Sequence, residues 1–145
     1  MVPDVPPVVP VLLVRPFDPP AHAYGAGHRG IDLSASTGQT VRAMAAGRIA
    51  FVGTVADIPV LTIEHAGGLR STYQPVIASR PVGTQVTAGQ EVGVVADFGG
   101  HCGGRLGCVH VGLRDGDSYR DPTPWLTTVA LKTLPPRPAG APAGT

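Results

Sequence analysis

Charge, lysine and long apolar runs are scarce in this sequence, and each shortage excludes a class of function. Charged residues make up 14% of the 145 residues and the formal net charge is +1. This low, nearly balanced charge disfavours a basic nucleic-acid surface, and no acidic or basic tail suggests a partner. The longest apolar run, roughly residues 6–14, contains three prolines and is far shorter than the ~20 residues that a membrane-spanning helix needs. We therefore expect a chain that does not span a membrane.

A secretory signal is also not visible at the start of the sequence. Met1 is followed by Asp4 and by prolines, whereas a signal peptide begins with basic residues and an apolar segment. Because the first residue printed need not be the native start, this observation leaves the location of the protein open.

Glycine and proline are abundant, and their distribution indicates how the chain is divided. Eleven of the 16 prolines lie in residues 1–26 and 127–145, whereas residues 27–126 hold 17 of the 20 glycines. A chain of this length fits one domain. We expect a Pro-rich N-terminal arm over residues 1–26 and a domain over residues 27–126. Residues 127–145 then hold a helix end and a Pro/Ala/Gly-rich tail.

Short β-rich runs recur about every ten residues and are separated by glycines. The expected strands are Arg48–Val52, Val60–Glu64, Ser71–Val76, Glu91–Ala96 and Val109–Leu113. This spacing predicts an all-β fold with an antiparallel β-sandwich or barrel-sandwich core. One short C-terminal helix is expected, with Thr123 as its N-cap, Pro124 as its first residue and Trp125 packed on the body.

Two glycine-containing segments, residues 41–49 and 82–92, resemble each other. Paired segments of this kind occur in the carrier domains that hold biotin or lipoate. Such a carrier needs a lysine at an exposed hairpin tip, and the only lysine is Lys132. A carrier function is therefore excluded.

Two short motifs contain residue types that bind metals. In the first, a strand entered after Gly30 would turn the imidazole of His28 and the carboxylate of Asp32 toward one point, and this pair suits zinc. In the second, strand geometry places Cys108 and His110 on one side, while Val109 and Val111 face the core. Each motif also has an ordinary explanation: a surface pair without metal, and a half-buried strand whose histidine is hydrogen-bonded.

Together with the β-rich runs, these motifs give the chain a resemblance to the catalytic domain of the lysostaphin-type, or LytM-domain, zinc endopeptidases. Those enzymes cut peptide cross-bridges in bacterial peptidoglycan. The matching sequence segments are HRGIDL, VRAMAAGRIAFVG, LTIEHAGGLRSTY, VGTQVTAGQEVGVV and CVHVGLR, followed by the closing Asp-Pro and Trp-Leu pairs. It runs from His28 to Leu126 in the order that the family has.

The resemblance implies a zinc site and a role in the cell wall. The family's His-x-x-x-Asp motif falls on His28 and Asp32, and the second histidine of its His-x-His motif falls on His110, so these are the expected Zn²⁺ ligands. Three protein ligands and one position open to water are typical of catalytic zinc. The implied function is a zinc-dependent endopeptidase acting on peptidoglycan peptides outside the cell membrane. The alternative is a non-catalytic module that binds wall peptides or a partner wall hydrolase.

Two positions differ from the family pattern. Cys108 replaces the first histidine of His-x-His, and a second catalytic histidine, in the family's Tyr-x-His-Leu strand, falls on Pro75. General acid/base assistance is worth about 10²-fold to 10⁴-fold in rate, so the enzyme is expected to be severely weakened or inactive. His101 and Tyr24 are the candidate substitutes, although a solvated loop histidine and a surface aromatic are the ordinary interpretations. For His65, beside two glycines, we expect a role in a turn.

Three chemical states of Cys108 are compatible with the sequence. A disulfide with Cys102 would close a short loop and stabilise the fold by about 2 to 3 kcal/mol. A thiolate on the metal would instead complete a closed, structural site, and a free buried thiol would be only a small hydrophobe. The disulfide is favoured, because a wall domain works outside the membrane, where disulfides persist.

Overall fold

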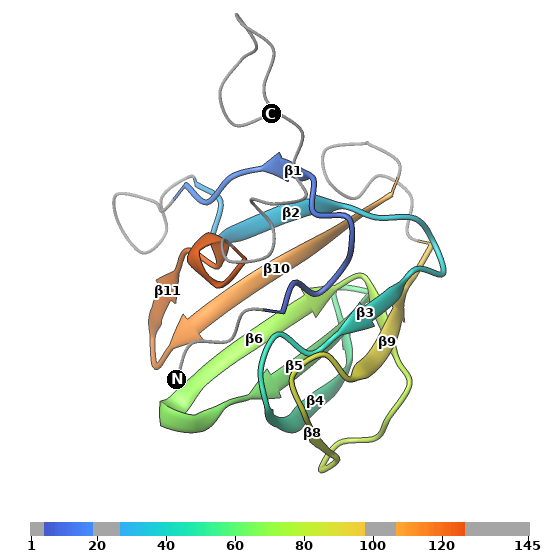
Figure 1. Cartoon of the computed structure of the whole chain (residues 1–145), viewed down its shortest axis with the longest axis vertical. Helices are drawn as coiled ribbons and strands as arrows, with labels where there is room; N and C mark the ends of the chain where they lie inside the picture. Colours follow the sequence, from blue (N-terminus) through green and yellow to red (C-terminus); the bar gives the residue numbers. More distant parts are fainter. Residues whose placement is uncertain (1–4, 19–26, 98–106, 127–145) are drawn as a thin grey trace, which may run out of the picture.

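The computed structural model describes residues 5–18, 27–97 and 107–126. Within these ranges the only helical elements are two 3₁₀ turns, η1 (Ala66–Gly68) and η2 (Thr123–Trp125). No helix in the described ranges is long and apolar enough to cross a membrane. Strands make up the rest of the regular structure (Figure 1). The predicted all-β fold is confirmed.

The strands form two antiparallel sheets. In spatial order, the larger sheet contains β1 (Leu13–Arg15), β2 (Gly30–Ser34), β10 (Cys108–Asp115), β6 (Leu69–Gln74), β5 (Ile58–Glu64), β4 (Gly47–Val55) and β8 (Gln85–Val86), and β11 (Ser118–Arg120) pairs with β10. The smaller sheet contains β3 (Thr40–Arg42), β9 (Glu91–Val95) and β7 (Val76–Ala78). Figure 1 shows β2, β10 and β6 running side by side through the larger sheet.

The hydrophobic core combines side chains from both sheets, and the alternation along β10 shows how the sequence builds it. Val109 and Val111 are fully buried and Leu113 is 2% exposed. His110 and Arg114 lie on the opposite face, because successive side chains of a strand point to opposite faces of the sheet. Burial of each large aliphatic side chain stabilises the fold by roughly 1.5 to 3 kcal/mol. The prediction that the valines beside His110 face the core is confirmed.

The predicted strand Ser71–Val76 is wrong as a single strand. β6 ends at Gln74, and Val76 begins β7 in the other sheet. The break falls at Pro75, which has no N–H to donate to a ladder. The Pro75 carbonyl instead accepts the N–H of Ala96 at 2.9 Å. The chain therefore leaves the larger sheet and enters the smaller one at this proline.

The two similar segments pair with each other. β3 pairs with β9, and β4 pairs with β8. At the turns between them, the N–H of Ala43 donates to the Gln90 carbonyl at 2.9 Å, and the N–H of Gly89 donates to the Ala43 carbonyl at 2.8 Å. Gly89 has a φ of +85°, which a residue with a Cβ adopts only at a cost. The repeat therefore joins the two sheets.

The described part of the N-terminal arm packs on the domain. β1 pairs with β2, and the N–H of Ser34 donates to the Leu12 carbonyl at 2.8 Å. Val8 and Val11, only 1% and 3% exposed, belong to the core. The arm therefore lies along β2, next to the residues that the sequence marks as metal ligands.

The C-terminal helix differs from the prediction at its start. η2 begins at Thr123, not at Pro124, and its N-cap is Pro122. The carboxylate of Asp121, just before the N-cap, accepts the N–H of Thr123 at 2.9 Å, and the side chain of Thr123 does not cap the turn. A carboxylate oxygen is a good acceptor for a free N–H at a helix start.

Candidate metal centre

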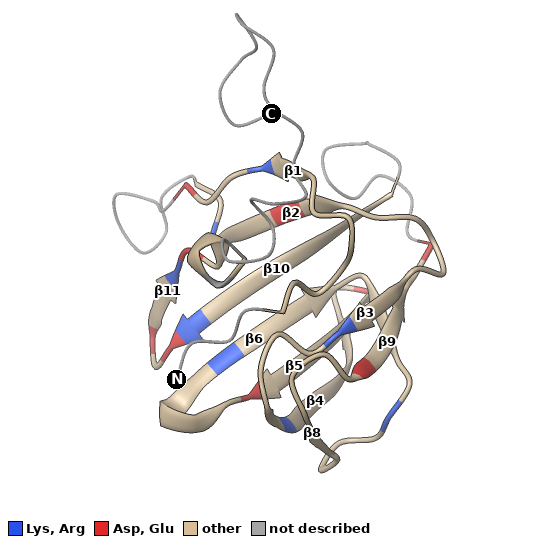
Figure 2. Ribbon diagram, in the orientation of Figure 1, with Lys and Arg blue, Asp and Glu red and all other residues tan. Residues whose placement is uncertain are grey.

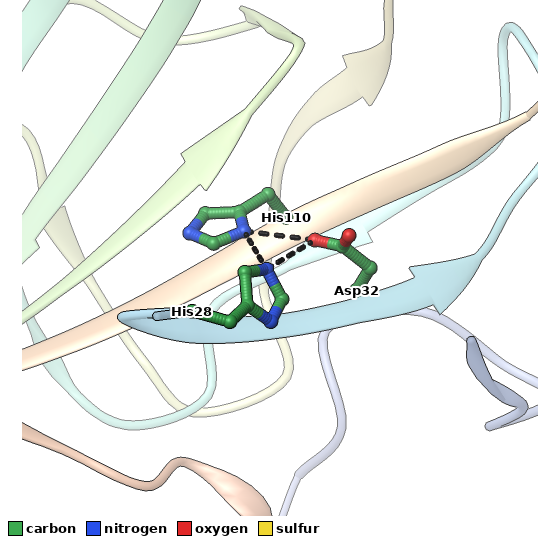
Figure 3. A group of neighbouring side chains, drawn as sticks. All are labelled: His28, Asp32 and His110. Atoms are coloured by element: carbon green, nitrogen blue, oxygen red, sulfur yellow. Dashed lines mark hydrogen bonds and ion pairs between the residues drawn. The ribbon is translucent and has the colours of Figure 1, made fainter. Parts of the chain in front are cut away.

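The three predicted ligand residues come together where β2 meets β10. Asp32 and His110 are direct partners in the antiparallel ladder, so their side chains lie next to each other on one face. His28 precedes β2 and exchanges two backbone hydrogen bonds with Asp18, which hold it against the N-terminal arm. Figure 3 shows the three side chains pointing toward one another.

The atoms that face one another are His28 Nε2, Asp32 Oδ1 and His110 Nδ1. His28 Nε2 lies 3.2 Å from His110 Nδ1 and 3.2 Å from Asp32 Oδ1, and His110 Nδ1 lies 2.8 Å from Asp32 Oδ1. On a tetrahedral zinc with bonds of about 2.0 to 2.1 Å, neighbouring ligand atoms are roughly 3.4 Å apart. The separations therefore fit three ligands of one zinc ion.

The carbonyl of Pro16 determines which nitrogen of His28 carries hydrogen. It lies 2.9 Å from His28 Nδ1, and a carbonyl only accepts, so Nδ1 is the donor. In a neutral ring the lone pair is then on Nε2, which faces Asp32 Oδ1. Two acceptors at 3.2 Å repel unless a proton or a metal cation lies between them. A backbone carbonyl behind a histidine is the usual support of a metal ligand.

The cluster is buried on one side and open on the other. His28 and Asp32 are 6% and 3% exposed, whereas the side chain of His110 is 21% exposed. His110 borders a groove of about 350 Å³ on the sheet surface. The groove is also lined by Arg29, Thr62, Arg70, Thr72, Gln74, Gly112, Leu113, Arg114 and Tyr119. A ligand in the groove would therefore reach the cluster from the His110 side.

Gly30 lets β2 and β10 approach closely beside the cluster. A Cβ at this position would lie 2.7 Å from His110 Nε2 and would also collide with the carbonyl oxygen of Val111. Only glycine fits without movement of His110 or of β10. The glycine between His28 and Asp32 is thus part of the geometry of the site.

Of the other predicted site residues, only Cys108 lies in the part of the chain that the structure describes, and it does not join this cluster. Cys108 is described and is 4% exposed, but the metal-binding group found among the described residues comprises only His28, Asp32 and His110. Cys102, His101 and Tyr24 lie outside the described residues. The disulfide between Cys102 and Cys108, and the roles of His101 and Tyr24, stay predictions.

His65 belongs to a separate buried network. Its Nδ1 donates to the Ala46 carbonyl at 2.9 Å, its Nε2 lies 2.7 Å from Ser71 Oγ, and Ser71 Oγ lies 2.7 Å from the Tyr73 hydroxyl. Burial lowers the pKa of His65 and raises the pKa of Tyr73 to about 12. His65 is the N-cap residue of η1, but its side chain holds strands together in the interior.

Gln74 is a groove residue that the sequence analysis missed. It is the ladder partner of His110 and lines the groove with it. The signal was the alternation of Arg70, Thr72 and Gln74 along β6, which places all three on the face opposite the core. Their common face was visible in the sequence, but their position beside His110 required the pairing of β6 with β10.

A comparison with protein families identifies the chain. Residues 26–122 match the family described as Peptidase family M23. The chain belongs to this family. The M23 chain is 36% identical to the uncharacterized protein Rv2891 of Mycobacterium tuberculosis over 131 residues, which cover 87% of this chain and 52% of that protein. It thus spans about half the length of the curated relatives that it matches.

Solved structures support the same assignment. A mutant catalytic domain of the prophage-encoded M23 protein EnpA from Enterococcus faecalis superposes with a TM-score of 0.65 and 28% identity, over 82% of this chain and 95% of that chain. A chain of the SpoIIQ–SpoIIIAH pore-forming complex superposes with a TM-score of 0.67 and 21% identity, over 93% of this chain and 100% of that chain. The resemblance to LytM-type domains is confirmed.

Proposed function

We propose that this M23 chain is a zinc-dependent endopeptidase-like domain that acts on peptidoglycan peptides outside the cell membrane. The observation that carries the proposal is the convergence of His28, Asp32 and His110, whose facing atoms are 2.8 to 3.2 Å apart. Two imidazoles and one carboxylate are a donor set that zinc prefers. The Pro16 carbonyl behind His28 adds the expected support for a metal ligand.

The groove gives this cluster access to an extended peptide. Zinc held by the three residues would acidify a bound water and polarise the scissile carbonyl. The buried His28 and Asp32 keep bulk water from the inner side of the cluster, while His110 faces the groove. Gln74 offers an amide donor beside His110, but an amide cannot transfer a proton at neutral pH. We therefore expect hydrolysis to be slower by about 10²-fold to 10⁴-fold than in a member with both catalytic imidazoles.

The second candidate is a catalytically degenerate module of the same fold that binds wall peptides or activates a partner hydrolase. Its support is the replacement of the two imidazoles by Pro75 and Cys108. Pro75 is buried between β6 and β7 and has no titratable group. The likeness to a chain of the SpoIIQ–SpoIIIAH complex adds a relative of this fold that works within an assembly.

Digestion of purified peptidoglycan separates the two candidates. The zinc-loaded wild type should release free amines, and a chelator or the substitution His28→Ala should abolish the release. His65→Gln is the matched control, because it changes a histidine outside the cluster and should retain the release once circular dichroism shows it to be folded. If the wild type binds zinc but releases no amine, the endopeptidase is contradicted, and co-sedimentation with peptidoglycan then tests the binding module.

A further inference from the structure

We propose that the groove beside the metal centre is a carboxylate-binding subsite, in which Arg70 and Arg114 select peptides that carry an acidic side chain. The inference rests on the proposed function, since it names the substrate chemistry of the same groove. Three arginines, Arg29, Arg70 and Arg114, line the groove, and none of its described lining residues is acidic. The protein as a whole carries a formal charge of only +1, so positive charge is concentrated here.

The placement of Arg70 opposite Arg114 brings two positive charges next to each other. The two residues are direct partners in the ladder between β6 and β10, and Figure 2 shows their two strands carrying positive charge side by side. Like charges directly opposite each other on neighbouring strands are destabilising. A bound carboxylate would relieve this repulsion, because it attracts both guanidinium groups at once.

Glu64 compensates only part of this charge. Its carboxylate is shared between Arg48, at 3.2 Å, and Arg70, at 3.1 Å. In the described part of the chain, Arg114 forms no ion pair, and its Nε donates to the Gly116 carbonyl at 3.2 Å. Arg114 therefore keeps its two terminal nitrogens for a ligand, and Arg70 contributes from the opposite strand.

Tyr119 lies close to two of the three guanidinium groups of the groove. The guanidinium carbons of Arg29 and Arg114 each lie 5.8 Å from the centre of its ring, within the range of a cation–π interaction. A planar guanidinium can bind a carboxylate through two parallel hydrogen bonds. The groove thus presents guanidinium groups beside an aromatic ring, where a carboxylate can reach them.

The spacing along β10 determines where the carboxylate must lie in a peptide. His110, Gly112 and Arg114 line the groove from one face of the strand. At about 3.4 Å per residue, His110 and Arg114 are roughly 14 Å apart, which is about four residues of an extended peptide. Gly112 leaves the floor between them open, because a Cβ there would meet nothing closer than 4.0 Å. The preferred peptide carries a carboxylate about four residues from the group that faces the metal centre.

Peptide binding tests this subsite directly. The probes are two peptides, each labelled with an uncharged dye and amidated at its C-terminus. One consists of four glycines followed by glutamate, and the other has glutamine in place of the glutamate. Fluorescence anisotropy on the zinc-loaded chain should show at least about tenfold tighter binding of the glutamate peptide at low salt, and a smaller difference at high salt. Arg114→Gln should remove most of the preference, and Arg114→Lys should restore part of it. Arg80→Gln, outside the groove, should retain it.

The outcomes separate this inference from the proposed function. Equal binding of the two peptides by the wild type, or a preference that survives in a folded Arg70→Gln/Arg114→Gln double variant, would overturn the subsite even if peptidoglycan is digested. A glutamate preference that depends on Arg114, without any release of amines, would keep the subsite and assign it to the non-catalytic module.

Discussion

Two histidines of this protein show what decides the role of a single residue. His28 and His65 both donate Nδ1–H to a backbone carbonyl at 2.9 Å, and both are almost completely buried. They differ in what faces Nε2. In His65 it is the hydroxyl of Ser71, which can donate a hydrogen bond, whereas in His28 it is Asp32 and His110, which bring further acceptor atoms. His65 is therefore satisfied by the protein, whereas His28 Nε2 needs either a proton or a metal cation between it and Asp32 Oδ1.

Because His65 is buried, the free energy of unfolding should depend on pH. Burial lowers its pKa below the ordinary value of 6.5, so the unfolded chain binds a proton at a higher pH than the folded protein does. Stability is therefore complete above about pH 6.5 and falls as the pH decreases below it. We expect the wild type to lose more unfolding free energy between about pH 7.5 and 5.5 than His65→Gln loses. Urea unfolding with a chelator present measures this, and parallel pH profiles would contradict it.

At the scale of elements, the contact between β2 and β10 determines the geometry of the metal centre. Gly30 and Gly112 are direct partners across these strands, but a Cβ at Gly30 would collide with β10, whereas one at Gly112 would not. We expect Gly30→Ala to lower the unfolding free energy by about 1 to 3 kcal/mol and to weaken zinc binding by displacing His110. Gly112→Ala is the matched control and should change both much less. Calorimetry measures both quantities, and equal effects of the two substitutions would refute this role of Gly30.

Elements were predictable from the sequence where a β-rich run was long enough to be recognised between glycines. β4, β5, β9 and β10 were located within a few residues in this way, and the alternation of buried and exposed positions is clearest along β10. β1, β8 and β11 contain only two or three residues each, which is too short to show a periodic pattern of apolar and polar residues. The packing of Val8 and Val11 was not predictable either, since a proline-rich segment looks like a linker whether or not it is buried.

At the scale of the whole molecule, the ligand set was predictable and the groove was not. His28, Asp32 and His110 were named from motif spacing and a family resemblance, and the structure brings them together. Arg70 and Arg114 lie far apart in the sequence and become neighbours only through the β6–β10 ladder. Local patterns therefore indicate the chemistry of a metal site, whereas the chemistry of a substrate surface depends on strand pairing.

X-ray absorption at the zinc edge tests the metal centre most directly, because it distinguishes nitrogen and oxygen ligands from sulfur. The purified chain, loaded with zinc, should hold about one ion per molecule, with only nitrogen and oxygen neighbours at about 2.0 to 2.2 Å. The Asp32→Ala variant should not retain stoichiometric zinc. A sulfur neighbour at about 2.3 Å would put a cysteine on the metal in place of an open position. That result, or a chain that takes up no zinc, would contradict a three-ligand site formed by His28, Asp32 and His110.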